Sequence, residues 1–318
     1  MKILVTGGAG FIGSITAKRL IDLGHRVVIV DSLERGNRWA IDSRAKFIQG
    51  NLLNKNFVKK VFIQKFDGVV HFAGYISMEE SMKNPGLYFK NNLGSIMNVL
   101  DGMNFSQSNN LVFSSSAGVY GNASKIPIPE NSECRPANPY GESKLMAEDL
   151  LKWHKIKSVA LRYFNAAGAL PDTSLGEAHN PETHIIPLAI EKAIKGGEFL
   201  LFGTDYPTPD GTCVRDYIHV LDLTEAHILA LKVLWKKKNI LPAYNVGTGK
   251  GHSNKEVLEM VEKISGKKIK IKNQKRRPGD LAILIADNAM IKKHLGFKPK
   301  HSDLKTIIKT AYNWHIKV

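Results

Sequence analysis

The sequence places a tyrosine and a lysine four residues apart, in Tyr140-Gly141-Glu142-Ser143-Lys144, near the start of a stretch with helical periodicity. Residues four apart lie on the same face of a helix, so the two side chains project in one direction. An ammonium group close to a phenol favours the phenolate and lowers the phenol pKa from about 10 toward neutral pH. We therefore expect Tyr140 to act as a general base and Lys144 to lower its pKa.

Three serines, Ser114-Ser115-Ser116, follow the apolar run Leu111-Val112-Phe113. Ligands of open α/β sheets bind at the carboxyl ends of the strands, which is where these serines fall. A tyrosine–lysine pair alone is usually a solvated surface pair, and a serine cluster alone usually belongs to a turn. The catalytic interpretation therefore depends on a third motif.

That motif is the glycine-rich stretch from Thr6 to Gly13, which lies between an apolar strand and a helix-forming segment. Glycines at such a turn let backbone N–H groups approach a pyrophosphate, whose charge the helix N-terminus stabilises. The letters fit both G-x-G-x-x-G from Gly8 and G-x-x-G-x-x-G from Gly7. Asp31 ends the next apolar run, where its carboxylate can accept hydrogen bonds from a ribose and repel a 2′-phosphate. We therefore expect NAD, not NADP, as the cofactor.

The elements that must position these residues alternate along the first half of the chain. Short apolar runs predict strands at 2–6, 26–31, 68–72, 110–114 and 157–163, and helical patterns lie at 12–23, 86–103 and 139–153. This alternation predicts a doubly wound parallel sheet of the Rossmann type. From about residue 166 the alternation breaks, and helices are expected at 186–195, 220–235, 253–265 and 302–314. We expect a dinucleotide-binding domain at 1–165, joined by part of 212–235, and a smaller mixed α/β domain formed mainly by 166–318.

Composition is typical of a globular protein, since 43% of the 318 residues are hydrophobic and 23% are charged. No apolar run approaches the roughly 18 residues of a membrane span, and the N-terminus has no signal-peptide pattern. We therefore expect no membrane association and a cytoplasmic location. The two cysteines, Cys134 and Cys213, form neither a disulfide framework nor a metal-ligand cluster. We accordingly expect no metal site and no thiol catalysis.

Positive charge is concentrated near the C-terminus, where residues 232–318 carry 21 basic and 6 acidic side chains. The segment from Lys267 to Lys272 alternates lysine with isoleucine after its first pair of lysines, which is typical of a strand with one buried and one solvated face. No aromatic residues are interleaved to stack on bases. We expect no nucleic-acid partner.

Together these motifs resemble the extended short-chain dehydrogenase/reductase family, whose marks are T-G-x-x-G-x-x-G, a serine after a central strand, and Y-x-x-x-K. Motifs in the second half resemble the branch of that family formed by UDP-hexose 4-epimerases. The resemblance covers nearly the whole chain and rests on His71-Phe72-Ala73-Gly74, Asn91-Asn92, Ser114-Ser115-Ser116-Ala117-Gly118-Val119-Tyr120-Gly121, Asn138-Pro139-Tyr140-Gly141, Leu161-Arg162-Tyr163-Phe164-Asn165, Asp205-Tyr206-Pro207-Thr208, Val214-Arg215-Asp216-Tyr217-Ile218-His219-Val220 and Arg276-Arg277-Pro278-Gly279-Asp280-Leu281.

The resemblance implies an isomerase of galactose metabolism that interconverts UDP-galactose and UDP-glucose. NAD would oxidise the sugar at C4, and the 4-keto intermediate would turn over and be reduced on its opposite face. By resemblance, Tyr140 takes the proton from O4, Lys144 binds the nicotinamide ribose, and Ser116 hydrogen-bonds O4 and relays its proton. The implied cofactor-binding residues are Gly7, Gly10, Phe11, Ile12, Gly13, Asp31, Asn51, Leu52, Phe72, Ala73, Gly74, Asn91, Ser114, Tyr140, Lys144 and Tyr163.

The resemblance also implies a UDP-hexose site and a homodimer formed through helices 86–103 and 139–153. Its substrate contacts, besides Ser116 and Tyr140, are Asn165 as an amide donor, Arg215 and Arg277 at the diphosphate, Tyr217 and Asp280 near the uridine ribose, and Leu284 at the sugar.

Three positions depart from the family pattern. Asn51 replaces an aspartate that commonly contacts the adenine, and Ile76 replaces a lysine that some members direct at the cofactor. Leu284 is intermediate between an aromatic residue, found where only glucose and galactose are accepted, and a small residue, found where N-acetylated sugars are also accepted.

Other activities stay open at this point. A UDP-N-acetylglucosamine 4-epimerase or a dual-specificity epimerase would share these motifs. Related 4,6-dehydratases carry Thr-Asp-Glu where this chain has Ser116-Ala117-Gly118. A catalytically silent NAD sensor or RNA-binding member of the fold would typically lack Tyr140 or Lys144, both of which are present.

Overall fold

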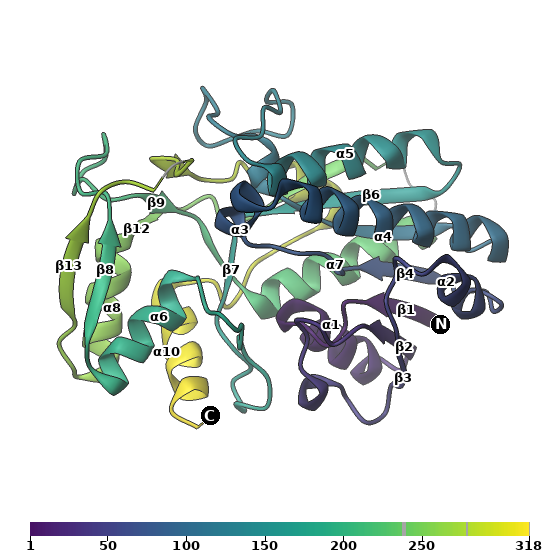
Figure 1. Cartoon of the computed structure of the whole chain (residues 1–318), viewed down its shortest axis with the longest axis horizontal. Coiled ribbons are helices and arrows are strands. Elements are labelled where there is room, and N and C mark those ends of the chain that lie inside the picture. Colours follow the sequence, from purple (N-terminus) through teal and green to yellow (C-terminus); the bar gives the residue numbers. More distant parts are fainter. Residues whose placement is uncertain (237–239, 278, 318) are drawn as a thin grey trace.

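The computed structural model describes residues 1–236, 240–277 and 279–317. In that part of the chain, the central element is a parallel seven-stranded sheet with the strand order β11-β6-β5-β4-β1-β2-β3 (Figure 1). Its strands are β1 (Lys2–Thr6), β2 (Arg26–Asp31), β3 (Lys46–Gln49), β4 (Gly68–His71), β5 (Asn110–Ser116), β6 (Lys157–Tyr163) and β11 (Ala243–Val246). The predicted doubly wound sheet is confirmed.

Helices cover both faces of this sheet because its strands are apolar on both sides. Ile3 and Val5 of β1 are buried in a core with α1 and α7, whereas Leu4 is buried in a second core with α2, α4 and α5. The covering helices are α1 (Phe11–Asp22), α7 (Val220–Trp235), α2 (Lys55–Val61), α4 (Pro85–Ser106) and α5 (Pro139–Trp153), and α3 (Met78–Lys83) and α9 (Ala289–Leu295) lie at the periphery. The short 3₁₀ turns are η1 (Arg38–Ala40) and η2 (Ala117–Val119).

Two strands of the sheet were not expected from the sequence. β3 is a four-residue strand at the edge of the sheet. β11 comes from the second half of the chain and pairs with β6, with Ala243 opposite Ala160. β11 is short and contains Asn245, so its apolar signal is weak. The first sheet therefore draws on both halves of the sequence.

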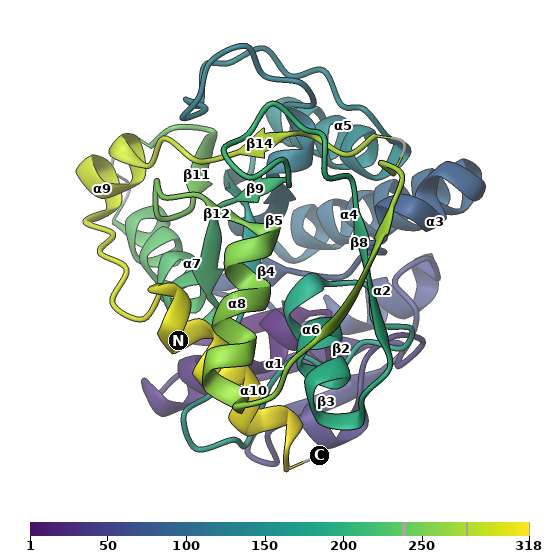
Figure 2. The ribbon, with the colours of Figure 1, turned by 90° about the vertical axis from the view of Figure 1, so that its left-hand side faces the viewer.

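The second half also forms small sheets around a core of its own (Figure 2). β7 (Asn165–Ala167) pairs with β10 (Tyr217–His219), and β9 (Val214–Arg215) lies between β12 (His252–Ser253) and β14 (Ile283–Leu284). β8 (Glu198–Phe202) pairs with β13 (Lys270–Gln274) beside α6 (Ile185–Lys195), α8 (Asn254–Ser265) and α10 (Leu304–His315). The smaller mixed α/β part is confirmed, and the assignment of each half to a ligand stays a prediction.

The predicted strand in the lysine–isoleucine segment is correct only in part. Ile269 is buried, but Ile271 is 42% exposed although it pairs with the buried Phe199. The reason is that β13 lies at the rim of a two-stranded sheet and α6 packs against β8. Within the described ranges, no helix is both long and apolar enough to cross a bilayer.

A buried carboxylate joins the small sheets to the strand that returns to the main sheet. Asp216 accepts hydrogen bonds from the backbone N–H groups of Thr248 (2.8 Å), Gly249 (2.9 Å) and Ala286 (3.2 Å), and from the Thr248 hydroxyl (2.7 Å). It is fully buried. Burial raises the pKa of Asp216, while these hydrogen bonds lower it. The carboxylate thus holds the segment after β11 and the segment after β14 beside β9 and β10.

We predict that Asp216→Asn lowers the free energy of unfolding by about 2 kcal/mol, because an NH₂ group would face backbone N–H donors that then lack an acceptor. Urea denaturation measures the loss. The matched control is Asp149→Asn, since Asp149 is exposed and pairs only with the exposed Lys152, and it should change stability by at most about 0.5 kcal/mol. Equal losses in the two variants would contradict the role given to Asp216.

Candidate active site

A cavity of about 880 Å³ lies at the carboxyl edge of the seven-stranded sheet, between that sheet and the small sheets of the second half. The structure brings most of the predicted site residues into its wall. Those that line it are Gly7, Gly10, Phe11, Ile12, Gly13, Asp31, Asn51, Leu52, Phe72, Ala73, Gly74, Asn91, Ser114, Ser116, Tyr140, Tyr163, Asn165, Arg215, Tyr217, Asp280 and Leu284. Lys144 and Arg277 are not among the lining residues.

The glycine-rich loop is shaped by close backbone contacts. Gly7 has φ +71°, and a Cβ atom there would lie 2.6 Å from the backbone nitrogen of Ala73. A Cβ atom on Gly13 would lie 2.2 Å from the Gly7 carbonyl oxygen. α1 begins directly after Gly10, with no acidic residue in its first turn. The N–H groups at this helix end can therefore receive an anion such as a pyrophosphate.

Asp31 is fixed at the end of β2 beside this loop. Its carboxylate accepts hydrogen bonds from the N–H groups of Ala9 (3.0 Å) and Leu33 (2.8 Å). Nearby, Asn51 accepts from the Leu53 N–H (2.8 Å) and donates to Glu34 (2.9 Å). A negative carboxylate held at this place favours ribose hydroxyls and disfavours a 2′-phosphate.

The tyrosine, lysine and serine meet at the start of α5. Asn138 caps this helix by accepting from the Gly141 N–H (2.9 Å), so Tyr140 and Lys144 lie in its first turns. Tyr140 lines the cavity, whereas the Lys144 Nζ is buried behind it, 5.9 Å from the centre of the tyrosine ring. Ser116 lines the cavity at the end of β5, where its hydroxyl accepts the Gly118 N–H (3.0 Å) and lies close enough to Tyr140 to affect the pKa of that phenol.

Burial dominates the electrostatics of this pair. It raises the pKa of Tyr140, and the hydrogen bond with Ser116 acts in the opposite direction. Burial also lowers the pKa of Lys144 to about 8, although the nearby Glu148 raises it. The net pKa of Tyr140 is therefore raised by burial, not lowered toward neutral pH as the sequence predicted. That Lys144 favours the phenolate stays a prediction. In this structure its ammonium group donates to the Ser114 carbonyl oxygen at 2.8 Å.

The opposite wall comes from the small sheets. Leu284 of β14 pairs in register with Arg215 of β9, and both line the cavity. The Arg215 guanidinium donates to the Leu281 carbonyl (2.7 Å) and lies 3.8 Å from Asp280. Tyr217 also lines the cavity, and its buried hydroxyl has no hydrogen-bond partner among the described residues. That hydroxyl is suited to a polar group of a bound molecule.

Arg277 lies apart from this wall. Its guanidinium stacks on the Phe202 ring, 3.9 Å from the ring centre. The hydrogen bond with Lys83 is the main cause that lowers the pKa of Glu79 on α3, and the charge of Arg277 adds to it. Residue 278 of the same motif lies outside the described residues. The assignment of Arg277 to a diphosphate stays a prediction.

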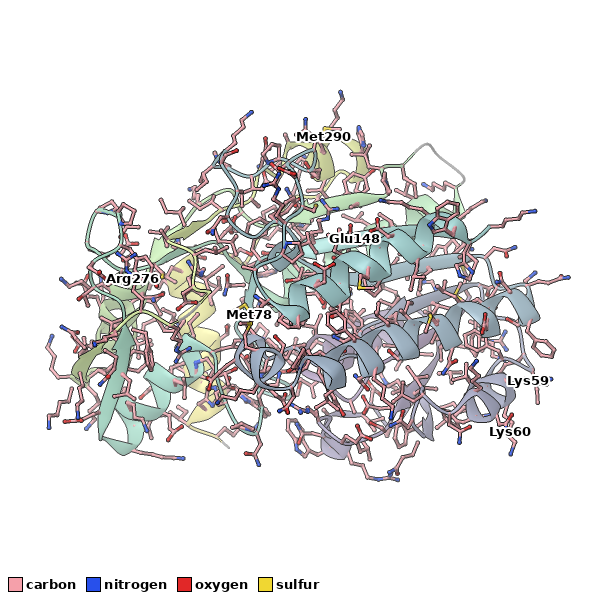
Figure 3. All side chains as sticks on the ribbon, turned by 45° about the horizontal axis from the view of Figure 1, so that its top comes forward. Lys59, Lys60, Met78, Glu148, Arg276 and Met290 are labelled. Carbon is pink, nitrogen blue, oxygen red and sulfur yellow. The ribbon has the colours of Figure 1, made fainter. Side chains whose placement is uncertain are left out.

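A buried polar network beneath the cavity was not predicted from the sequence. Glu148 lies one turn after Lys144 on α5 (Figure 3). Its carboxylate accepts hydrogen bonds from the Arg162 Nε (2.9 and 3.1 Å) and Nη2 (2.5 Å) and from the Ser115 hydroxyl. Arg162 also donates to the Tyr120 hydroxyl at 2.9 Å, which in turn donates to Asn245 of β11. The network ties α5 to β5, β6 and β11. Its only sequence signal was the spacing of four residues between Lys144 and Glu148.

A second group that was not predicted lies between β7 and α6, and consists of Glu177, His179, Glu182 and His184. Glu177, His179 and His184 line the cavity. The repeated pattern E-x-H-x-x-E-x-H is the sequence signal that would have found this group.

Comparison with known proteins adds three findings. Residues 3–247 match the model of the NAD dependent epimerase/dehydratase family. The chain is 47% identical to a Lacticaseibacillus casei protein named UDP-glucose 4-epimerase, over 99% of this chain and 97% of the relative.

Two solved structures are also similar over nearly their whole length. UDP-glucose 4-epimerase from Brucella ovis in complex with NAD is 40% identical with a TM-score of 0.93, over 98% of both chains. The enzyme of the same name from Bifidobacterium longum, in complex with NAD⁺ and UDP, is 35% identical with a TM-score of 0.94, over 100% of this chain and 98% of the other.

We predict that Glu148→Gln lowers the free energy of unfolding by about 3 kcal/mol, because it leaves the buried Arg162 without its counter-charge. The pKa of Lys144 should fall further, since the carboxylate that raises it is gone. Urea denaturation and NMR titration of labelled lysine measure the two effects. Glu133→Gln is the matched control, because Glu133 pairs with Arg135 at an exposed site; a Lys144 pKa unmoved by Glu148→Gln would contradict the electrostatic link.

Proposed function

The chain belongs to the NAD dependent epimerase/dehydratase family, and on that premise we propose that it interconverts UDP-galactose and UDP-glucose. The observation that carries the proposal is the catalytic wall of the cavity. Tyr140 and Ser116 face the cavity there, and Lys144 is buried directly behind them. Relatives that match over nearly the full length carry the name of this activity.

The residues around the glycine-rich loop fit NAD. The tight contacts at Gly7 and Gly13 leave a cradle that any side chain would fill, and the first N–H groups of α1 would bind the pyrophosphate. Asp31 would bind the adenosine ribose, and Asn51 and Leu52 line the adenine side. NAD held by these residues would supply reversible hydride transfer at C4 of the sugar.

Proton transfer is the task of Tyr140. It takes the proton from the sugar O4 as the hydride leaves C4, and it gives that proton back after reduction on the other face. Ser116 hydrogen-bonds O4 and bridges it to the tyrosine. Because the Lys144 pKa is about 8, most of its ammonium groups stay charged at neutral pH and favour the phenolate when Tyr140 ionises.

The second half of the chain would hold the nucleotide. The Arg215 fork suits a diphosphate, and the unpartnered Tyr217 hydroxyl and Asp280 suit the uridine ribose. Asn165, at the start of β7, would donate its amide to the UDP-sugar between these two walls. This arrangement leaves the C4 edge of the sugar beside Tyr140.

A cytoplasmic location, a place in galactose metabolism and the lack of a nucleic-acid partner stay predictions of the sequence. The dimer is a further proposal with structural support. α4 and α5 pack side by side (Figures 1 and 3) and carry exposed apolar side chains, which are Met97 and Phe105 on α4 and Met146 and Trp153 on α5. Trp153 is 87% exposed. We propose that this face packs against the same helices of a second copy, because a two-helix apolar face is buried when four helices pair.

We predict that Tyr140→Phe slows epimerisation by about 10²- to 10⁴-fold while UDP binding is retained, because one proton-transfer group is lost. NMR of purified protein mixed with UDP-galactose measures turnover, and calorimetry with UDP measures binding. Tyr312→Phe on α10 is the control, and it should keep normal turnover. Normal turnover in Tyr140→Phe would refute the mechanism.

We predict that Leu284 limits the size of the 2-substituent on the sugar. Leu284→Tyr should slow turnover of UDP-N-acetylglucosamine more than that of UDP-glucose, because close packing leaves little room for an acetamido group beside a larger ring. Leu284→Ala should shift the ratio of the two rates in the opposite direction. A change of about 1.4 kcal/mol in the difference between the two activation barriers changes the ratio of the two rates tenfold. If neither variant changes that ratio, residues other than Leu284 determine the sugar specificity.

We predict that Met97→Glu combined with Met146→Glu converts a homodimer into a monomer, because two charges would be buried at the α4–α5 face. Light scattering measures the mass, with 35.3 kDa expected for one chain. Ile63→Glu is the control, since Ile63 is equally apolar and exposed but lies after α2. A wild-type protein with the mass of one chain would overturn the dimer.

A further inference from the structure

The segment between β7 and α6 brings four side chains with metal-ligating atoms close together, and three of them, Glu177, His179 and His184, line the cavity. Glu177, His179, Glu182 and His184 each contribute one such atom, and all four atoms lie within 4.8 Å of one another. The two cysteines form no metal-ligand cluster, and no metal site was predicted from the sequence. These four residues offer two imidazole nitrogens and two carboxylate oxygens instead.

The distances suit a small four-coordinate ion. The His179 Nδ1 lies 3.1 Å from the Glu177 Oε1 and 3.8 Å from the Glu182 Oε2, and the His184 Nδ1 contacts the same Glu177 oxygen and lies 3.8 Å from the Glu182 Oε1. Ligand atoms about 2.0–2.1 Å from a tetrahedral zinc ion are about 3.3 Å apart. Small side-chain adjustments therefore reach this geometry without moving the backbone.

The surrounding structure orients the ligands. The Glu182 Oε1 accepts the backbone N–H groups of Thr183 (2.7 Å) and His184 (2.8 Å), which directs the other oxygen toward His179. The Trp314 indole donates to the Glu177 carbonyl at 3.0 Å, and the Asn37 amide donates to the Ala178 carbonyl at 3.1 Å. Such outer contacts are what fix the ligands of protein metal sites.

Two further observations point to a bound cation. Glu177 is only 4% exposed, so its carboxylate is largely removed from water. The His179 Nδ1 is also buried, and the Glu177 Oε1, 3.1 Å away, does not meet it with the geometry of a hydrogen bond. The lone pair of the His179 Nδ1 is directed into the group of four side chains, where it would coordinate a metal ion.

We propose that Glu177, His179, Glu182 and His184 bind one divalent transition-metal ion, of which Zn²⁺ fits the ligand set best. Imidazole nitrogens favour zinc over magnesium or calcium, which prefer oxygen ligands alone. Two carboxylates balance the charge of the ion when both imidazoles are neutral. Four protein ligands leave no open position, so the site is structural and does not take part in the C4 chemistry.

The ion would brace one wall of the cavity. The His179 ring packs edge-on against Phe11 of the glycine-rich loop, with 6.5 Å between the ring centres. Trp314 of α10 holds the other side of the segment, which passes between α10 and α1 (Figure 1). A metal ion here therefore links the cofactor loop to the helices of the second half. The proposal does not depend on which sugar the protein converts.

The test uses the full-length protein with its resident cofactor, treated with EDTA and then dialysed. Calorimetric titration with Zn²⁺ should give one equivalent per chain, and Co²⁺ should give the visible absorption of a tetrahedral site. His179→Gln, Glu182→Gln and Glu177→Gln should each weaken Zn²⁺ binding by at least about 10-fold. Zn²⁺ should also raise the melting temperature of the wild type and not that of these variants.

The matched control is His252→Gln, because His252 lies 3.9 Å from Glu256 and this histidine–glutamate pair is not part of the group of four residues. It should bind Zn²⁺ like the wild type. If the buried Glu177→Gln fails to fold, His179→Gln and Glu182→Gln, at less buried positions, decide the result. The proposal is overturned if the wild type binds no stoichiometric Zn²⁺, or if the ligand variants bind it as tightly as His252→Gln does.

Discussion

A buried charge must keep its partners, and the pair formed by Glu148 and Arg162 imposes that requirement on the active site. Both side chains are almost fully buried, so neither can exchange its partner for water. Glu148 belongs to α5, Arg162 to β6, and Ser115, which also bonds Glu148, to β5. Fixing these three elements against one another also fixes the cavity-facing residues next to them in the chain, which are Ser114 and Ser116 on β5 and Tyr163 on β6. The same pair holds the helix α5 whose first turn carries Tyr140.

The second half of the chain forms the opposite wall of the cavity, and a buried carboxylate also positions that wall. Asp216 is a buried acceptor surrounded by backbone donors from segments that lie far apart in sequence. Its neighbours Arg215 and Tyr217 thereby face the catalytic wall. The group of Glu177, His179, Glu182 and His184 adds a third connection, between the cofactor loop and α10. Three polar groups therefore position the cavity walls: the Glu148–Arg162 pair, Asp216 with its donors, and the group from Glu177 to His184. Each of them contacts segments that lie far apart in the sequence.

Burial has opposite effects on the two catalytic ionisations. Burial favours the neutral phenol of Tyr140 and the neutral amine of Lys144. It therefore disfavours the pair of a phenolate and an ammonium group, which is the form that accepts a proton most readily. The carboxylate of Glu148 works against this on the lysine side. The site therefore balances exclusion of water, which a reactive 4-keto sugar needs, against the cost of keeping an ammonium group charged.

The sequence by itself determined the local features of this protein. Apolar runs and helical periodicity located β1, β2, β4, β5, β6 and the main helices, and turn chemistry identified the loop from Gly7 to Gly13, because these signals depend on neighbouring residues only. The spacing of Tyr140 and Lys144 placed both on one helix face for the same reason. The tertiary structure alone decided the addition of β11 to the main sheet, the joining of Glu148 to Arg162, and the direction of the Tyr140 pKa. Those features depend on burial and on contacts between residues far apart in the chain, which no local pattern records.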